Sequence, residues 1–94
     1  MLYERSELLI KEGMEDAFAA EMADKGLPLL KALDGANAVY FGQGVENPDK
    51  FMLLIEWETL DAHTAFKTAP VYPEFLSLVA SYAKGGVMEH FNMS

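Results

Sequence analysis

The sequence predicts an α+β fold in which a four-stranded antiparallel sheet carries helices on one face. Segments with strand-like alternation and segments with helical spacing follow one another in the order β-α-β-β-α-β. A chain of 94 residues is one domain long, so residues 1–94 are expected to form a single domain. The hydrophobic fraction of 51% supplies more apolar surface than one small core buries, which favours an oligomer or a lined cavity.

The first half of the chain is expected to form strand, helix and strand. Residues 2–10 have the composition of a strand, although their early part is polar. Residues 14–33 have apolar side chains at helical spacing. Gly26 and Pro28 are expected to interrupt this helix, because proline lacks a backbone donor and clashes with the preceding turn. Residues 36–44 are expected to form the second strand.

The second half of the chain is also expected to form strand, helix and strand. Residues 51–58 alternate most clearly between apolar and other side chains, as a strand does. Thr59 is expected to cap a short helix that follows directly. Residues 74–84 predict a further helical segment that Gly85-Gly86 stops, and residues 87–93 predict the last strand. Two split βαβ units of this kind are typical of the ferredoxin-like fold.

No segment remains to cover the second face of this sheet. An uncovered apolar face is typical of an interaction surface, and a second copy of the chain is its simplest cover. We therefore expect a homodimer with the two sheets face to face.

Charge and composition exclude several classes of function. Seven basic and fifteen acidic residues give a net charge of −8, which repels nucleic acids and anionic membranes. The absence of cysteine excludes disulfides, thiolate nucleophiles and iron–sulfur clusters. We expect neither a signal peptide nor a membrane span, which needs about 18 apolar residues in a row. A cytoplasmic location follows as the expectation.

A resemblance to a known family lies in residues 51–66. An apolar strand ends there in Glu56-Trp57, and a short helix carrying Ala62-His63 follows. This stretch, together with Glu89-His90-Phe91 near the end, resembles the antibiotic biosynthesis monooxygenase family of dimeric α+β barrel proteins. The resemblance implies two protomers whose sheets form a barrel around a pocket.

The resemblance also implies chemistry without a cofactor. Family members include monooxygenases that use no metal, flavin or nicotinamide and deprotonate an electron-rich aromatic compound, such as an anthrone or quinol, for reaction with O₂. Such a site needs a dry apolar pocket, a proton acceptor and groups that stabilise an oxyanion. Relatives also include haem-degrading enzymes, isomerases, decarboxylases and proteins without an assigned activity, and the fold alone does not choose among them.

The chain departs from two branches of the family. The haem-degrading branch has its ligand histidine about ten positions after the strand tryptophan, whereas His63 follows Trp57 by six, and the first strand here has no asparagine. The anthrone-oxidising branch has an asparagine at the position of Leu53 and a tyrosine at that of His63. Haem degradation is therefore not expected, and the oxyanion partner of the anthrone branch is missing.

His63 is the candidate proton acceptor, because the histidine pKa of about 6.5 suits base chemistry near neutral pH. A histidine that only packs against the helix is the alternative. His90 is the candidate secondary polar group in substrate binding, with a structural hydrogen bond at the interface as its alternative. Two histidines without cysteine make a weak metal site, so no metal ligand is expected.

The candidate pocket wall is the apolar face of residues 51–58, formed by Trp57, Phe51, Leu53 and Ile55. Plain core packing is the alternative interpretation of these side chains. Glu56 and Glu58 fall on the opposite face and are not expected to form a catalytic pair.

Two functions follow from this pattern. The first is a monooxygenase, and therefore an oxidoreductase, acting on a small apolar aromatic or quinol-like molecule. The second is a non-catalytic dimer that binds a small ligand or serves a stress response, and an isomerase is a third possibility. Convergent polar groups on the Trp57 face would favour catalysis, and a lone histidine would favour binding.

Overall fold

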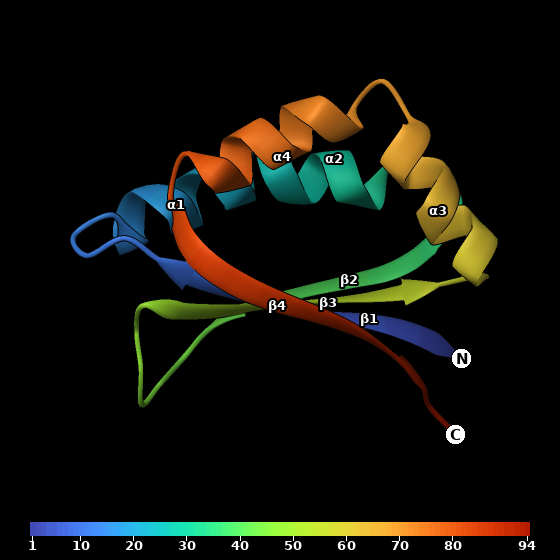
Figure 1. The fold of residues 1–94 in the computed structure, drawn as a ribbon, viewed down its shortest axis with the longest axis horizontal. Helices are drawn as coiled ribbons and strands as arrows, with labels where there is room; N and C mark the ends of the chain where they lie inside the picture. Colours follow the sequence, from blue (N-terminus) through green and yellow to red (C-terminus); the bar gives the residue numbers. More distant parts are fainter.

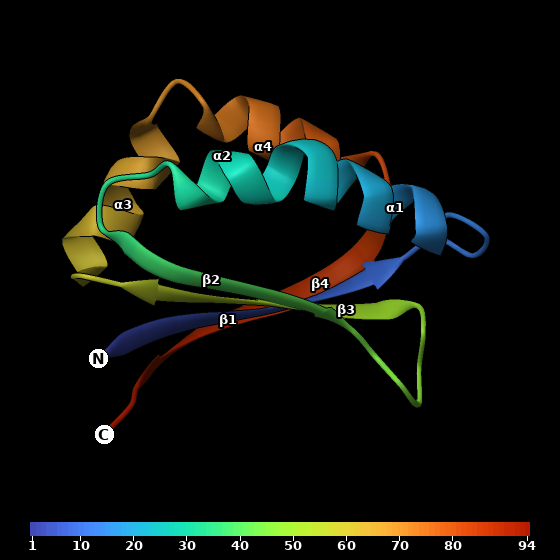
Figure 2. The same cartoon turned by 180° about the vertical axis from the view of Figure 1, so that it is seen from behind.

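A computed structural model describes residues 1–94 as one sheet beneath a layer of helices (Figures 1 and 2). The elements in chain order are β1 (Leu2–Ile10), α1 (Glu15–Glu21), η1 (Met22–Gly26), α2 (Leu27–Lys31), β2 (Ala36–Gln43), β3 (Lys50–Trp57), α3 (Leu60–Thr68), α4 (Tyr72–Ala80) and β4 (Ala83–Asn92). The strands are antiparallel in the order β2-β3-β1-β4. This arrangement confirms the predicted α+β, ferredoxin-like fold.

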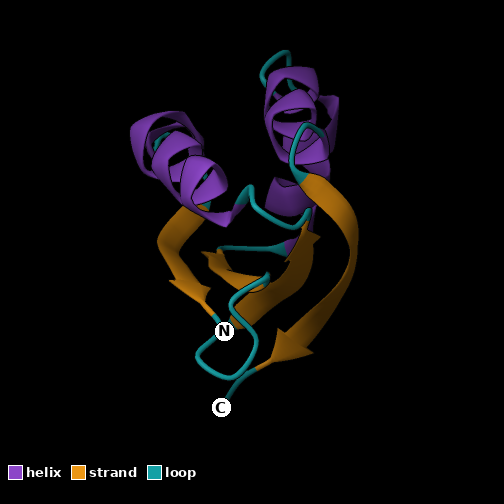
Figure 3. Cartoon of the chain, turned by 90° about the vertical axis from the view of Figure 1, so that its left-hand side faces the viewer, coloured by secondary structure: helices purple, strands orange, loops and turns teal.

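All helices cover the same face of the sheet, and none lies below it (Figure 3). The ten buried core residues fill the space between the two layers; they are Ile10, Phe18, Met22, Leu30, Phe51, Leu53, Ile55, Trp57, Phe66 and Phe75. The other face of the sheet, here called the outer face, carries exposed apolar side chains that include Tyr40, Met52 and Phe91. None of the helices is long and apolar enough to cross a membrane.

The first helical segment runs from Glu15 to Lys31 without the expected interruption. Instead, the helix widens to π geometry over Met22–Gly26, where the N–H of Leu27 bonds to the carbonyl of Met22. Proline at position 28 cannot donate a backbone hydrogen bond, and one wider turn is a known way to accommodate such a residue. The prediction that Gly26 and Pro28 break the helix is therefore wrong, although they do change its geometry.

The role predicted for Gly85-Gly86 is also wrong. The helix ends earlier, at Ala80, and both glycines lie within β4. A Cβ atom on Gly86 would lie 2.7 Å from the carbonyl oxygen of Glu7 on β1. Glycine therefore permits a close approach of the two strands, and the last strand starts four residues earlier than expected.

Candidate active site

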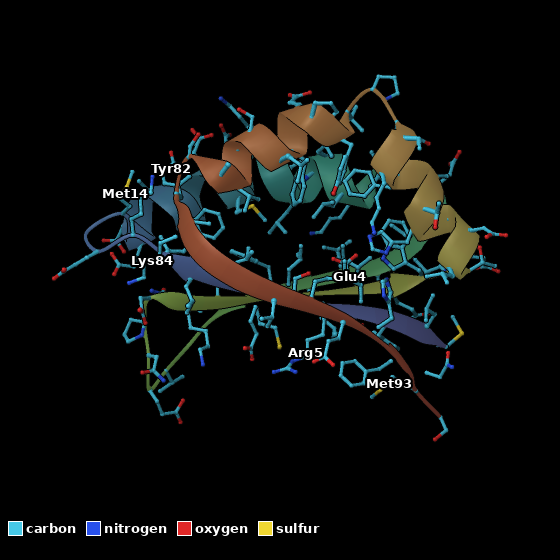
Figure 4. All side chains as sticks on the ribbon, viewed as in Figure 1. Glu4, Arg5, Met14, Tyr82, Lys84 and Met93 are labelled. Atoms are coloured by element: carbon cyan, nitrogen blue, oxygen red, sulfur yellow. The ribbon has the colours of Figure 1, made fainter.

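Strand pairing places a buried glutamate on the face of the sheet that the helices cover. Glu4 on β1 lies opposite Ile55 on β3 and opposite His90 on β4. The pleat turns Glu4 toward the helices and turns its neighbour Arg5 to the outer face (Figure 4). The Glu4 side chain is enclosed, since only 7% of the residue is exposed.

Two donors and one further contact hold the Glu4 carboxylate. Its Oε1 accepts a hydrogen bond from Nε1 of Trp57 at 3.0 Å and lies 3.1 Å from Nε2 of His63. Its Oε2 accepts from the Ser6 hydroxyl at 2.8 Å. Buried carboxylates are tolerated when charged or polar donors surround them in this way, so the site fixes the orientation of Glu4.

Helix α3 places His63 over this carboxylate. The hydroxyl of Thr59 accepts from the backbone N–H of Ala62, which confirms the predicted cap and fixes the start of the helix. The His63 ring stacks on the Trp57 indole with centroids 5.0 Å apart and is 3% exposed. Burial lowers the pKa of His63, the charge of Glu4 raises it, and His90 and Lys67 lower it further, with a net lowering.

His90 completes the cluster. Its Nε2 lies 2.6 Å from Nδ1 of His63, so the two imidazoles share a hydrogen bond. Nδ1 of His90 has no partner within the chain, and no unpaired side-chain nitrogen or oxygen is buried. The half-buried His90 therefore presents one free, accessible ring nitrogen. Glu4, His63 and His90 are called the triad below.

A cavity of about 180 Å³ borders the triad between the sheet and helices α3 and α4. Its polar lining consists of Glu4, Ser6, His63, Lys67 and the Tyr72 side chain. The remaining lining is apolar and comprises Leu8, Leu53, Phe66, Phe75, Leu76, Val79 and Met88. An apolar chamber with a few convergent polar groups is typical of a small-molecule site.

The residues predicted for the pocket wall divide into two groups. Leu53 lines the cavity, and Trp57 supports it by stacking on His63. Phe51 and Ile55 are buried in the core and do not reach the cavity. All four face the helices, so the expectation of a wall inside a barrel between two sheets needs correction: any pocket they form lies within one chain.

The outer face carries a separate, open depression of about 630 Å³. Tyr3 lies there and donates its hydroxyl hydrogen to Glu56 at 2.7 Å, and this hydrogen bond, with burial and the carboxylate charge, raises the pKa of Tyr3. Tyr40 and Phe91 also line it. Glu58 accepts a separate hydrogen bond from the side-chain amide of Asn37 at 2.7 Å.

The triad also has a set of atoms that can bind metals. Glu4, His63 and His90 each offer one ligand atom, and these atoms lie within 4.8 Å of one another. Two histidines and one carboxylate match known catalytic metal sites in composition. Here, however, His63 turns one ring nitrogen to Glu4 and the other to His90, so neither of its ring nitrogens is free to bind a metal.

Sequence patterns alone missed Glu4 and Ser6. Both occupy the polar part of the first strand, where clean alternation fails, and both are nearly buried. The available signal was spacing: Glu4, Ser6 and Leu8 share one face of the strand, so two polar groups interrupt an apolar face. Buried polar residues on a core face generally have partners, and the triad supplies them.

Comparisons with known proteins agree with this architecture. The sequence profile of the family described as antibiotic biosynthesis monooxygenase matches residues 1–78. The uncharacterized protein YczJ of Bacillus subtilis is 32% identical over 93 residues, which cover 97% of each chain.

Two solved structures extend the comparison. A Bordetella bronchiseptica protein, provisionally named an antibiotic biosynthesis monooxygenase, superposes with a TM-score of 0.88 at 26% identity, covering 99% of this chain and 96% of its own. A Nitrosomonas europaea protein with the same provisional name gives a TM-score of 0.84 at 17% identity over 99% and 98% of the two chains, a likeness of fold.

Proposed function

Because the chain belongs to the antibiotic biosynthesis monooxygenase family, we propose that it is a cofactor-independent monooxygenase acting on a small aromatic or quinol-like compound. The observation that carries this proposal is the buried triad at an apolar cavity. Several polar groups converge on the Trp57 side of the sheet, which favours catalysis over simple binding.

The proposed reaction begins with removal of a proton. The imidazoles of the triad take an acidic hydrogen from the substrate, and the bonding electron pair stays on the substrate carbon. O₂ is the oxidant: it adds to this carbanion, and the resulting peroxide takes back the proton and loses water. A CH₂ group and O₂ thus become a C=O group and H₂O, which balances without an added cofactor.

The lowered pKa of His63 supports this role, because a base must be unprotonated at the working pH. The apolar lining supports it too, since an enclosed site excludes water from a reactive carbanion. A volume of about 180 Å³ is below the roughly 300–1,000 Å³ usual for drug-sized ligands, so we propose a single-ring substrate.

We further propose that the chain works as a homodimer in the cytoplasm. The uncovered outer face supports the dimer, because Tyr40, Met52 and Phe91 remain exposed there in a single chain. A partner sheet on this face would leave the triad and its cavity within each protomer.

Oxygen uptake tests the proposed function. The purified chain, treated with a chelator, is incubated with a panel of single-ring quinols, naphthohydroquinones and anthrones while O₂ is followed with an electrode. We expect consumption above the autoxidation rate for at least one compound, product formation only in air, and no effect of the chelator. Tight binding of these compounds without O₂ consumption would instead establish the alternative function, a dimer that only binds a small ligand.

A further inference from the structure

The contacts of His63 occupy both of its ring nitrogens. Nε2 faces the Glu4 carboxylate and Nδ1 faces His90. A side chain with both nitrogens occupied cannot take a proton directly from a substrate. Resting on the proposed function, we propose that Nδ1 of His90 is the atom that accepts the substrate proton, with His63 and Glu4 behind it.

The Glu4 carboxylate determines which nitrogen carries the hydrogen in each of the two histidine rings. An ionised carboxylate only accepts, and Oε1 of Glu4 lies 3.1 Å from Nε2 of His63, so the favourable tautomer of His63 has its hydrogen on Nε2. In neutral His63 the other nitrogen, Nδ1, is then an acceptor. Nε2 of His90 must therefore donate across the 2.6 Å contact, which leaves the lone pair of His90 on Nδ1.

This lone pair lies at the accessible end of the triad, next to the cavity, although His90 itself is not one of the residues that line the cavity. His90 is half-buried, whereas Glu4 and His63 are almost fully enclosed. The absence of any buried, unpaired side-chain nitrogen means that Nδ1 of His90 is accessible. His90 follows Met88 on the same face of β4, and Met88 lines the cavity beside the triad.

Charge favours proton uptake by the triad as a unit. With both imidazoles neutral, the triad carries the single negative charge of Glu4 in a buried setting, which is costly. One added proton gives a carboxylate–imidazolium pair with no net charge. In the resting state, burial and the charge of Lys67 on α3 lower the pKa of His63 more than Glu4 raises it, so the neutral form of His63 is favoured until the substrate proton arrives.

The proton step conserves every hydrogen. A substrate hydrogen passes as a proton to Nδ1 of His90, and the electron pair stays on the substrate. The hydrogen on Nε2 of His90 moves to Nδ1 of His63. His63 becomes an imidazolium held by Glu4, and His90 ends as the neutral tautomer with its hydrogen on Nδ1.

Substitution of His90 by glutamine separates this role from a structural one. A glutamine amide can still donate to His63, but it cannot accept a proton. If Nδ1 of His90 is the acceptor, His90→Gln should lower kcat by about 10²–10⁴-fold, as much as His90→Ala. Glu89→Gln, the neighbouring residue on the opposite face of β4, serves as control and should keep the wild-type rate. A His90→Gln protein with wild-type kcat would overturn the proposal.

NMR of the ring nitrogens tests the triad without any substrate. The tag-free chain has two histidines, so two sets of ¹⁵N signals can be assigned. We expect hydrogen on Nε2 of both rings at neutral pH. Hydrogen on Nδ1 of His63 would overturn the proposal.

The same spectra distinguish failure of this proposal from failure of the proposed function. If the predicted tautomers are found but no quinol or anthrone causes O₂ uptake, the monooxygenase function is refuted, while the hydrogen arrangement of the triad stands. If turnover survives His90→Gln, the role of His90 as proton acceptor is refuted, while the monooxygenase function stands. Stoichiometric binding of added Zn²⁺ with submicromolar Kd, displacing the shared hydrogen bond, would show a metal site and overturn the triad as a proton acceptor.

Discussion

His63 and His90 are 27 positions apart in the chain, yet Nδ1 of one lies 2.6 Å from Nε2 of the other. Strand pairing brings His90 beside Glu4, and helix α3 brings His63 over the same carboxylate. Two imidazole nitrogens this close share one hydrogen bond, whose direction depends on the tautomers of both rings. The register of β1 and β4 therefore determines whether the two histidines can meet at the site.

Truncation of His63 should lower the turnover rate strongly and the free energy of unfolding only modestly. We expect His63→Ala to lower turnover by about 10²–10⁴-fold, because His90 loses the partner that receives its proton. The loss of the hydrogen bond to His90 and of the contact with buried Glu4 should also cost about 1–3 kcal/mol of unfolding free energy. Rate and melting temperature measured on one preparation give both values. Thr64→Ala, an exposed neighbour on α3, is the control, and an unchanged rate in folded His63→Ala would contradict the catalytic role.

Stability should fall on the acid side of neutrality. Burial lowers the pKa of folded His63 below the unfolded value of 6.5, so the unfolded chain binds the proton more readily. The contribution of neutral His63 is complete above about pH 6.5 and is lost as the pH falls toward the lower folded pKa. Glu4, His90 and Lys67 are the ionisable groups that face this ring.

Urea unfolding at several pH values measures this effect. His63→Gln cannot titrate at that position, so the difference in unfolding free energy between wild type and variant should shrink as the pH falls from 7 to 5. Activity should decline over the same interval, because an imidazolium cannot accept a proton. A difference that stays constant or grows over this interval would contradict the lowered pKa.

Removal of the indole N–H should delete one hydrogen bond to Glu4 while an aromatic ring still fills the core. Trp57→Phe keeps an aromatic ring over His63 but deletes the donor to Oε1 of Glu4. We expect a loss of about 1–3 kcal/mol from the unmet hydrogen bond, plus a cost for the smaller ring. Phe18→Leu, a change in the core that does not line the cavity, provides the comparison. Equal effects of the two variants on turnover would show that the Trp57 donor has no special role.

Charge placed on the outer face should prevent dimerisation. Light scattering at micromolar concentration should give about 21 kDa for wild type, twice the 10.4 kDa chain. Tyr40, which is 55% exposed in the single chain, would be buried by a partner sheet. Tyr40→Asp should therefore give a mass near one chain. A second variant, Leu76→Asp on the helical side, should leave the dimer intact, and a monomeric wild type would refute the face-to-face arrangement.

The fold was more predictable from sequence than the site. Alternation in residues 51–58 and helical spacing in residues 14–33 are local patterns, and they identified the elements and their order. The triad depends instead on register between strands that are distant in the chain, which no local pattern specifies. His63 and His90 could be named as candidates by residue type, but Glu4 could not, because its polar strand segment resembles a solvated edge.

Glycine at position 35 should matter for the placement of His63. Gly35 has a φ of +83°, and a Cβ atom there would lie 2.5 Å from Cβ of Ala62, the residue before His63. Gly13 has the same φ, but a Cβ atom there would meet nothing within 4 Å. Gly13→Ala thus reports backbone strain alone, whereas Gly35→Ala adds a clash that must move α3.

We expect Gly13→Ala to lower the free energy of unfolding by about 1–2 kcal/mol, the usual cost of an alanine in this conformation. Gly35→Ala should lose clearly more, since two side-chain carbons cannot approach to 2.5 Å and the helix must shift. Because Ala62 precedes His63, the shift should also disturb the contact of His63 with His90 and reduce turnover, while Gly13→Ala keeps the wild-type rate. Denaturant unfolding and the oxygen-uptake assay measure the two effects. Equal losses of unfolding free energy in the two variants would mean that α3 moves at no cost to accommodate the added Cβ atom. Gly35 would then not help to position the triad.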